Sequence, residues 1–78
     1  MNASEVAKLI RSVPFSPLRF YLSDGRSFDI AHPEMVIVDA TQMIIGRPSP
    51  RIEGVAESVQ FYSLLHITGA EKIQQEHA

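Results

Sequence analysis

The sequence predicts an α+β fold that is mainly β: an N-terminal helix followed by a five-stranded antiparallel small barrel. Two observations carry this prediction. Near the N-terminus apolar residues recur at helical spacing, whereas from Leu18 onward they alternate with polar residues in short runs separated by turn residues. The 78 residues make a single domain. We expect residues 1–78 to divide into a helix at 3–13, strands within 18–68, a mobile loop at 47–57 and a tail at 69–78.

The first element is the helix over residues 3–13. Asn2 and Glu5 have the spacing of a capping box, in which each side chain accepts a hydrogen bond from the backbone of the other. Pro14 ends the helix because it disfavours helical geometry at the preceding residue and has no N–H. We expect one apolar face to dock on the sheet, since so short a helix is not stable in isolation. That face has i, i+3, i+4, i+7 spacing and consists of Val6, Leu9, Ile10 and Val13.

The first two strands form a hairpin, and the alternation of their residues selects the length of its loop. A two-residue turn at Asp24-Gly25 would place Phe20 opposite Asp29 and mix apolar with polar side chains on one face. A three-residue loop at 23–25 instead places Phe20 opposite Phe28, which keeps the face apolar. Gly25 then supplies the positive φ that such a loop needs.

The middle of the chain carries two continuous apolar runs, Met35–Val38 and Met43–Ile45, which predict a further hairpin with both faces covered. Pro33 separates them from the second strand, since proline cannot donate to a ladder. We expect one face to point into the core. The second apolar face is expected to consist of Met35, Ile37, Met43 and Ile45. The short helix covers only part of a sheet, so this face favours self-association.

The second half contains a polar stretch and then two more strands. Residues 47–57 include two prolines and a glycine, which predicts the mobile loop. Val59 and Phe61 resume a strand, and a tight turn near Ser63 leads to the last one. The tail after Gly69 is expected either to form a short helix over 70–76 or to fray. Closure into a barrel would pair the sheet edges that a short sheet otherwise leaves bare.

Two resemblances follow from these motifs. The segment Phe20-Tyr21-Leu22-Ser23-Asp24-Gly25-Arg26-Ser27-Phe28, behind a leading helix, resembles the first hairpin of Sm-like barrels. That resemblance implies an Sm-like or SH3-like barrel, and Sm-like proteins form rings that bind RNA. The chain departs from the family at Ile30, where a glycine is usual, and it has no counterpart of the late RNA-contacting motif around 65–69. The resemblance therefore implies a fold and no binding residues.

The second resemblance is to short bacterial proteins of unassigned function. It rests on three phrases: Pro14-Phe15-Ser16-Pro17, Asp24-Gly25-Arg26 and His32-Pro33-Glu34. It implies a small bacterial cytosolic protein and no chemistry.

Composition narrows the classes of function. The absence of cysteine excludes disulfides, thiolate metal sites and a cysteine nucleophile. A formal net charge of −2 argues against strong sequence-independent binding of nucleic acid. The first residues lack a positively charged n-region, and no apolar run is long enough to span a bilayer. We therefore expect a cytoplasmic protein that does not bind membranes.

Two constellations could carry chemistry. His32 and Glu34 would project to one side of an extended segment and bind a metal with a third ligand such as Asp29 or His66, although a strand-ending corner explains the pair more simply. Four arginines with Tyr21 would make a phosphate or nucleic-acid patch if they converged, but the acidic net charge favours separate, solvated arginines. These arginines are Arg19, Arg26, Arg47 and Arg51.

The sequence thus predicts a non-enzymatic interaction module that forms a homo-oligomer through its sheet or its helix, with no cofactor and no bound metal. The alternative is a nucleic-acid-binding ring of the Sm-like type, which we do not favour. A metal-dependent enzyme ranks third, because His-x-Glu pairs are common and an active site needs convergent geometry. Other enzyme classes are not favoured either, because no serine lies in a nucleophile elbow and no phosphate loop is present. The candidate binding patch consists of Arg19, Tyr21, Arg26, His32 and Glu34.

Overall fold

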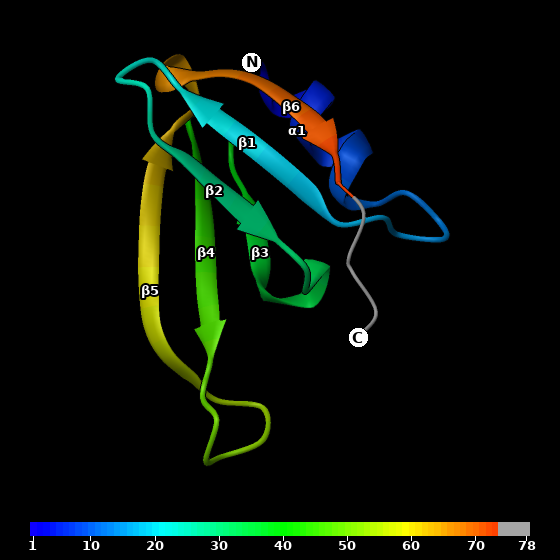
Figure 1. Ribbon diagram of the computed structural model, residues 1–78, viewed down its shortest axis with the longest axis vertical. Helices are drawn as coiled ribbons and strands as arrows, with labels where there is room; N and C mark the ends of the chain where they lie inside the picture. The colour runs from blue at the N-terminus through cyan, green and yellow to red at the C-terminus, as the bar shows by residue number, and fades with distance from the viewer. Residues whose placement is uncertain (74–78) are drawn as a thin grey trace.

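The computed structural model describes residues 1–73, and this part of the chain contains one α-helix, six β-strands and two short 3-10 helices (Figure 1). The prediction of an α+β, mainly β fold with a leading helix is confirmed. In chain order the elements are α1 (Ala3–Ile10), β1 (Leu18–Leu22), β2 (Ser27–Ile30), η1 (Pro33–Met35), β3 (Val36–Val38), β4 (Gln42–Pro48), β5 (Ala56–Ser63), η2 (Leu64–His66) and β6 (Ile67–Lys72).

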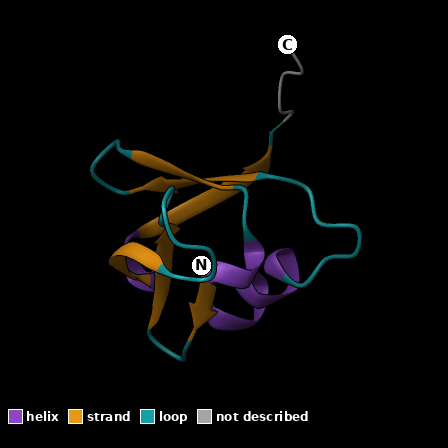
Figure 2. Cartoon of the chain, turned by 90° about the horizontal axis from the view of Figure 1, so that it is seen from below, coloured by secondary structure: helices purple, strands orange, loops and turns teal. Residues whose placement is uncertain are grey.

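The strands form two antiparallel sheets of three strands each, with the orders β2-β1-β6 and β3-β4-β5. Figure 2 gives this arrangement from below, with α1 beside the strands. The expected five-stranded small barrel is not confirmed, because within residues 1–73 there are six strands and no ladder joins one sheet to the other. The break after β2 has a physical cause. Pro33 starts η1 there and has no N–H to continue a ladder into β3.

Helix α1 begins as the sequence predicts. The Glu5 N–H donates to Asn2 Oδ1 at 2.8 Å and the Asn2 N–H donates to Glu5 Oε1 at 3.1 Å, which completes the capping box. The predicted end at residue 13 is wrong, because the helix stops at Ile10 and Val13 is 95% exposed. The following Pro14 disfavours helical geometry at Val13, and residues 11–17 connect α1 to β1. No helix within residues 1–73 is long and apolar enough to cross a membrane.

The first hairpin has the predicted three-residue loop. Phe20 lies opposite Phe28 in the ladder, and the Leu22 N–H donates to the Arg26 carbonyl at 2.8 Å across the loop. Gly25 has a φ of +91°, the left-handed conformation that side chains disfavour. Alternation of apolar residues therefore determined the register here, as expected from the period of two.

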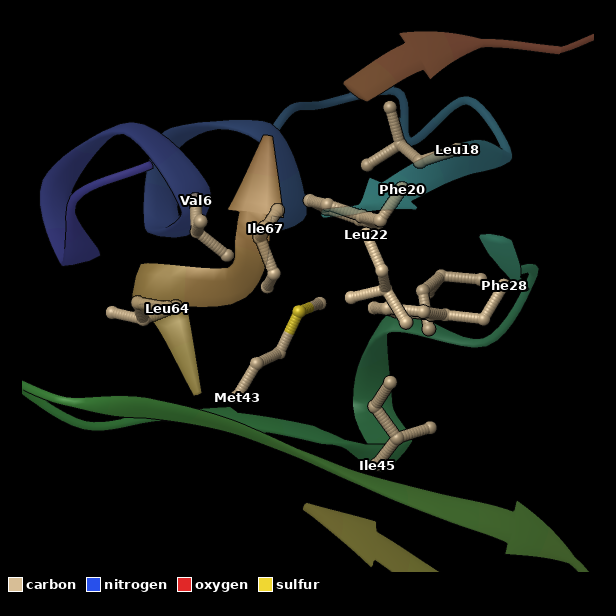
Figure 3. Packing of buried hydrophobic residues seen from close by; sticks show 10 residues of the cluster. Val6, Leu18, Phe20, Leu22, Phe28, Met43, Ile45, Leu64 and Ile67 are labelled. Atoms are coloured by element: carbon tan, nitrogen blue, oxygen red, sulfur yellow. The ribbon is translucent and has the colours of Figure 1, made fainter. Parts of the chain in front are cut away.

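The hydrophobic core lies between the two sheets, and α1 contributes Val6 at one end (Figure 3). An aromatic stack crosses the core: Phe20 lies on Phe28 with ring centroids 5.4 Å apart, and Phe28 lies on Tyr62 of β5 at 4.2 Å. The stack therefore joins the sheets in the absence of a shared ladder. The buried apolar residues are Val6, Leu18, Phe20, Leu22, Phe28, Ile30, Met43, Ile45, Leu64 and Ile67.

The polar stretch of the second half is shorter than predicted. β4 continues to Pro48 and β5 starts at Ala56, so residues 47–48 and 56–57 belong to strands and the connection is 49–55. Pro48 is tolerated because it sits at the end of the strand beside a register shift, where a ladder N–H is not needed. The mobility of this loop stays a prediction.

The C-terminal segment also differs from the expectation. Residues 69–72 belong to β6 and pair with β1, so neither the helical nor the frayed tail applies to them. β2 pairs with one edge of β1, and without β6 the N–H and C=O groups along the other edge of β1 would have no ladder partner. Ala70 also packs against the core. The rest of the expected tail, residues 74–78, lies outside the described residues.

Candidate interaction surface

Two members of the predicted patch, Arg19 and Tyr21, lie on the face of β1 opposite the buried Phe20. Arg19 donates from Nε and Nη2 to the two carboxylate oxygens of Asp29, at 2.8 and 3.1 Å. This guanidinium holds the pKa of Asp29 below its ordinary value. The Tyr21 hydroxyl donates to the Glu71 carboxylate on β6, and that bond raises the pKa of Tyr21. Both side chains are therefore engaged within the sheet.

The other members of the patch lie at opposite ends of the first hairpin. Arg26 follows the loop and pairs with Asp24, with Nε 2.7 Å from Oδ2. His32 follows the far end of β2, and its Nδ1 lies 3.6 Å from Glu34 Oε1. The structure thus brings Arg19 to Tyr21 and His32 to Glu34, and it does not bring all five residues into one site.

The possible metal ligands are separated in the same way. The ring of His66 lies 3.4 Å from the hydroxyl of Ser23, at the loop end of the hairpin, and is therefore distant from His32. The carboxylate of Asp29, a possible third ligand, forms an ion pair with Arg19. Within residues 1–73 no group of three histidine, aspartate or glutamate side chains is arranged to hold a metal ion.

Arg47, which was expected in a loop, lies on β4 and links the two sheets. Its Nη1 donates to the backbone carbonyl of Asp29 on β2 at 3.1 Å, and its Nε donates to Gln60 Oε1 at 3.1 Å. Arg19 and Arg47 thus meet at Asp29, one at its carboxylate and the other at its backbone carbonyl, whereas Arg26 pairs with Asp24 at the hairpin loop.

The most distinct surface is an apolar one on the β3-β4-β5 sheet. Met43 and Ile45 point into the core, so the alternate residues of β4 project from the opposite face. The register aligns Ile37, Ile44 and Phe61 in one row across the three strands. Val59 shares the face two residues before Phe61. We call Ile37, Ile44, Val59 and Phe61 the outer apolar face.

This outer apolar face is open to solvent. Ile37 and Phe61 are each 64% exposed and Val59 is 53% exposed. Two residues that flank it on the same side, Gln42 and Ser63, are uncharged, Gly46 presents no side chain, and the charged Glu57 lies beyond Val59 at the start of β5. The Met35 methyl occupies the space beside Gly46, 3.0 Å from the position that a Cβ would take. The face therefore presents contiguous apolar surface without a charged residue in its centre.

The sequence-based prediction of the second apolar face is partly wrong. Ile37 lies on it, and Met35 lies at its border, as expected. Met43 and Ile45 were expected there and are instead in the core. Ile44 and Phe61 were missed, because a continuous apolar run does not reveal which alternate set faces inward. The alternation of Val59 and Phe61 was visible in the sequence, but the face it occupies depends on the register with β4.

A groove of about 380 Å³ lies between the loop of the first hairpin and the end of β5. Arg26 and His66 line it on the hairpin and η2 sides, and Phe61, Tyr62 and Ser63 line it along β5. It is open and contains both polar and aromatic side chains. This groove borders the outer apolar face at Phe61.

Comparisons of the chain with protein-family models, with curated proteins and with solved structures find no match.

Proposed function

We propose that this chain is a non-enzymatic interaction module that self-associates through its β3-β4-β5 sheet. The single observation that supports the proposal is the apolar row of Ile37, Ile44 and Phe61, in which Ile37 and Phe61 are exposed and Ile44 is half-buried. Contiguous apolar patches on monomers are limited in size, and larger ones mark contact sites. Burying such surface contributes roughly 25 cal/mol per Å² removed from water.

The polar residues support an interaction role more than a catalytic one. Arg19, Asp29 and Tyr21 hold partners on an open strand face, which leaves no unpaired acid or base poised there. Catalytic groups generally converge in a concave site, with a base within hydrogen-bond reach of its target. As parts of the same proposal, the module works without a cofactor or metal and resides in a bacterial cytoplasm.

Light scattering coupled to size exclusion tests the proposal. We expect the mass of the wild-type protein to rise from that of a monomer with increasing concentration, and Phe61→Ser to abolish the rise. Val13→Ser is the matched control, since it also removes an exposed apolar side chain but lies in the connector after α1. A wild-type protein that stays monomeric at high micromolar concentration contradicts the proposal.

A further inference from the structure

The free edges of the two sheets differ in how well they are protected. β2 has four residues and receives the Arg47 side chain at its Asp29 carbonyl, β3 has three residues, and the edge of β6 carries Glu71 and Lys72. Short strands, charges and covering side chains are the usual means of preventing edge pairing. β5 has eight residues and contains no lysine, arginine or proline; its one charged residue, Glu57, lies near its start at the register shift, which leaves the edge from Ser58 to Ser63 without these protections. Among residues 1–73 no strand pairs with its second edge.

The ladder between β4 and β5 shows which backbone groups this edge presents. The Leu64 N–H donates to the Thr41 carbonyl at 3.0 Å, so these residues form a hydrogen-bonded pair at the end of the ladder. Bonded and non-bonded pairs alternate in an antiparallel ladder, so the even-numbered residues of β5 bond to β4. The N–H and C=O groups that point away from β4 belong to Val59, Phe61 and Ser63.

We propose that the occupant of this edge is β5 of a second copy, antiparallel and related by a two-fold axis at Gln60. This inference rests on the proposed self-association and adds which strands of the two copies pair and in which register. In this register Phe61 of each copy lies opposite Val59 of the other copy. The two residue pairs together make about four backbone hydrogen bonds. Phe61 and Val59 also share a face, so each ring covers an exposed valine and the outer apolar faces of the two copies become continuous.

Charge argues against two alternative pairings of the same strands. Glu57 is the only charged residue of β5. A parallel pairing in register would set the two Glu57 carboxylates side by side, and like charges on adjacent strands are destabilising. An antiparallel pairing centred on Val59 would set Glu57 opposite Phe61. The axis at Gln60 avoids both, because it sets Glu57 opposite Ser63.

The groove beside β5 supplies a complement for that carboxylate. Ser63 lines the groove together with Arg26 and His66. In the proposed pairing, Glu57 of the second copy therefore approaches a site that holds the Arg26 guanidinium, the Asp24 carboxylate paired with it, and the His66 imidazole. The ion pair of Arg26 with Asp24 uses the Nε–H, and a guanidinium has further N–H groups for a second carboxylate.

Single cysteine variants test the register directly, because the natural chain has no cysteine. Residues that face each other across a two-fold axis in a non-bonded pair have Cα atoms about 4.5 Å apart, which a disulfide can span. Gln60→Cys should therefore convert to a disulfide-linked dimer under mild oxidation. Ser58→Cys is the matched control on the same strand and face. In the paired strands the two substituted residues at position 58 would lie about 13 Å apart. This variant should therefore run as a monomer in denaturing, non-reducing electrophoresis.

The outcomes separate the inference from the proposed function. If light scattering shows a dimer but Gln60→Cys does not cross-link, or Ser58→Cys cross-links as well, the edge pairing is overturned and self-association stands. Ile37→Ser adds a second readout, since Ile37 lies two strands from the edge. It should leave the dimer intact under edge pairing and should abolish it if two outer apolar faces stack instead. A monomer in every variant and in the wild type overturns both.

Discussion

The ring of Phe28 stacks on that of Tyr62 with centroids 4.2 Å apart and planes inclined by 13°. Phe28 belongs to β2 and Tyr62 to β5, so this contact joins two sheets that share no ladder within residues 1–73. Aromatic pairs of this kind contribute more than the area they bury. The association of the sheets therefore depends on side-chain packing, in contrast to a barrel held by continuous backbone bonds.

Tyr62→Leu should destabilise the fold. The change keeps an apolar side chain but removes the stack on Phe28, which costs about 0.5–1.5 kcal/mol beyond the loss of buried area. Urea unfolding measures the difference in free energy. Phe61→Leu is the control, because the neighbouring ring points outward and should have little effect on the stability of the monomer. Equal effects of the two substitutions would contradict this role of the stack.

Gly25→Val should cost about 1–2 kcal/mol, because a β-branched residue is strained at a left-handed backbone position. The space around Gly25 is open, so the cost is conformational and not a clash. Gly69→Ala is the control, since Gly69 also has open space and has no positive φ. The melting temperature provides the readout. An unchanged value for Gly25→Val would show that the strain argument is wrong.

Asp39 should make stability depend on pH through the β3-β4 turn. Its carboxylate accepts from the backbone N–H groups of Thr41 and Gln42, each at 2.8 Å, and these bonds lower the pKa of Asp39. A lowered folded-state pKa means that the stabilisation is present above the unfolded value, about 3.9, and is lost as the pH falls through the folded value.

The comparison of wild type with Asp39→Asn across the acid range checks this dependence. The difference in unfolding free energy should be greatest near neutral pH and should shrink below about pH 4. Glu53→Gln, in the 49–55 connection, serves as the control. It also removes a carboxylate, but no hydrogen bond from the backbone to that carboxylate is described. A difference between wild type and Asp39→Asn that stays constant down to pH 2 would rule out the ionised carboxylate as the cause.

Nucleic acid should not bind appreciably. Arg19 and Arg26 are paired with aspartates, which offset their charge, and Arg47 is used between the sheets, so these arginines offer phosphates little uncompensated positive charge. We expect no retention of single-stranded RNA or DNA in filter binding at low salt. Retention that weakens steeply as salt is added would instead support the Sm-like alternative, because counterion release produces that dependence.

Local patterns predicted the local structure well. The alternation around Phe20 and Phe28 gave the hairpin register, and the spacing of Asn2 and Glu5 gave the helix cap. Both features depend on residues close in sequence. Sheet closure depends on contacts between distant strands, and the chain offered no period that distinguishes one closed sheet from two packed sheets.

The candidate surface was harder to predict for the same reason. The run Met43-Ile44-Ile45 is apolar at every position, so only the placement of β4 against the core separates Ile44 from its neighbours. Charged residues gave a misleading set of candidates: the predicted hairpin register already places Arg19 opposite Asp29, and the other members of the set lie at opposite ends of the hairpin. Which apolar residues of the β3-β4-β5 sheet face solvent can be recognised only once the register of its strands is known.

Amide hydrogen exchange at Val59 and Phe61 tests the central claim most directly. These N–H groups point away from β4 and have no ladder partner within residues 1–73, so we expect a second molecule to protect them, whereas the N–H groups of Gln60 and Tyr62 bond to β4 in the monomer. We predict that exchange at Val59 and Phe61 slows as the protein concentration rises, with Gln60 and Tyr62 protected throughout. Rapid exchange of Val59 and Phe61 at every concentration would contradict self-association through this edge.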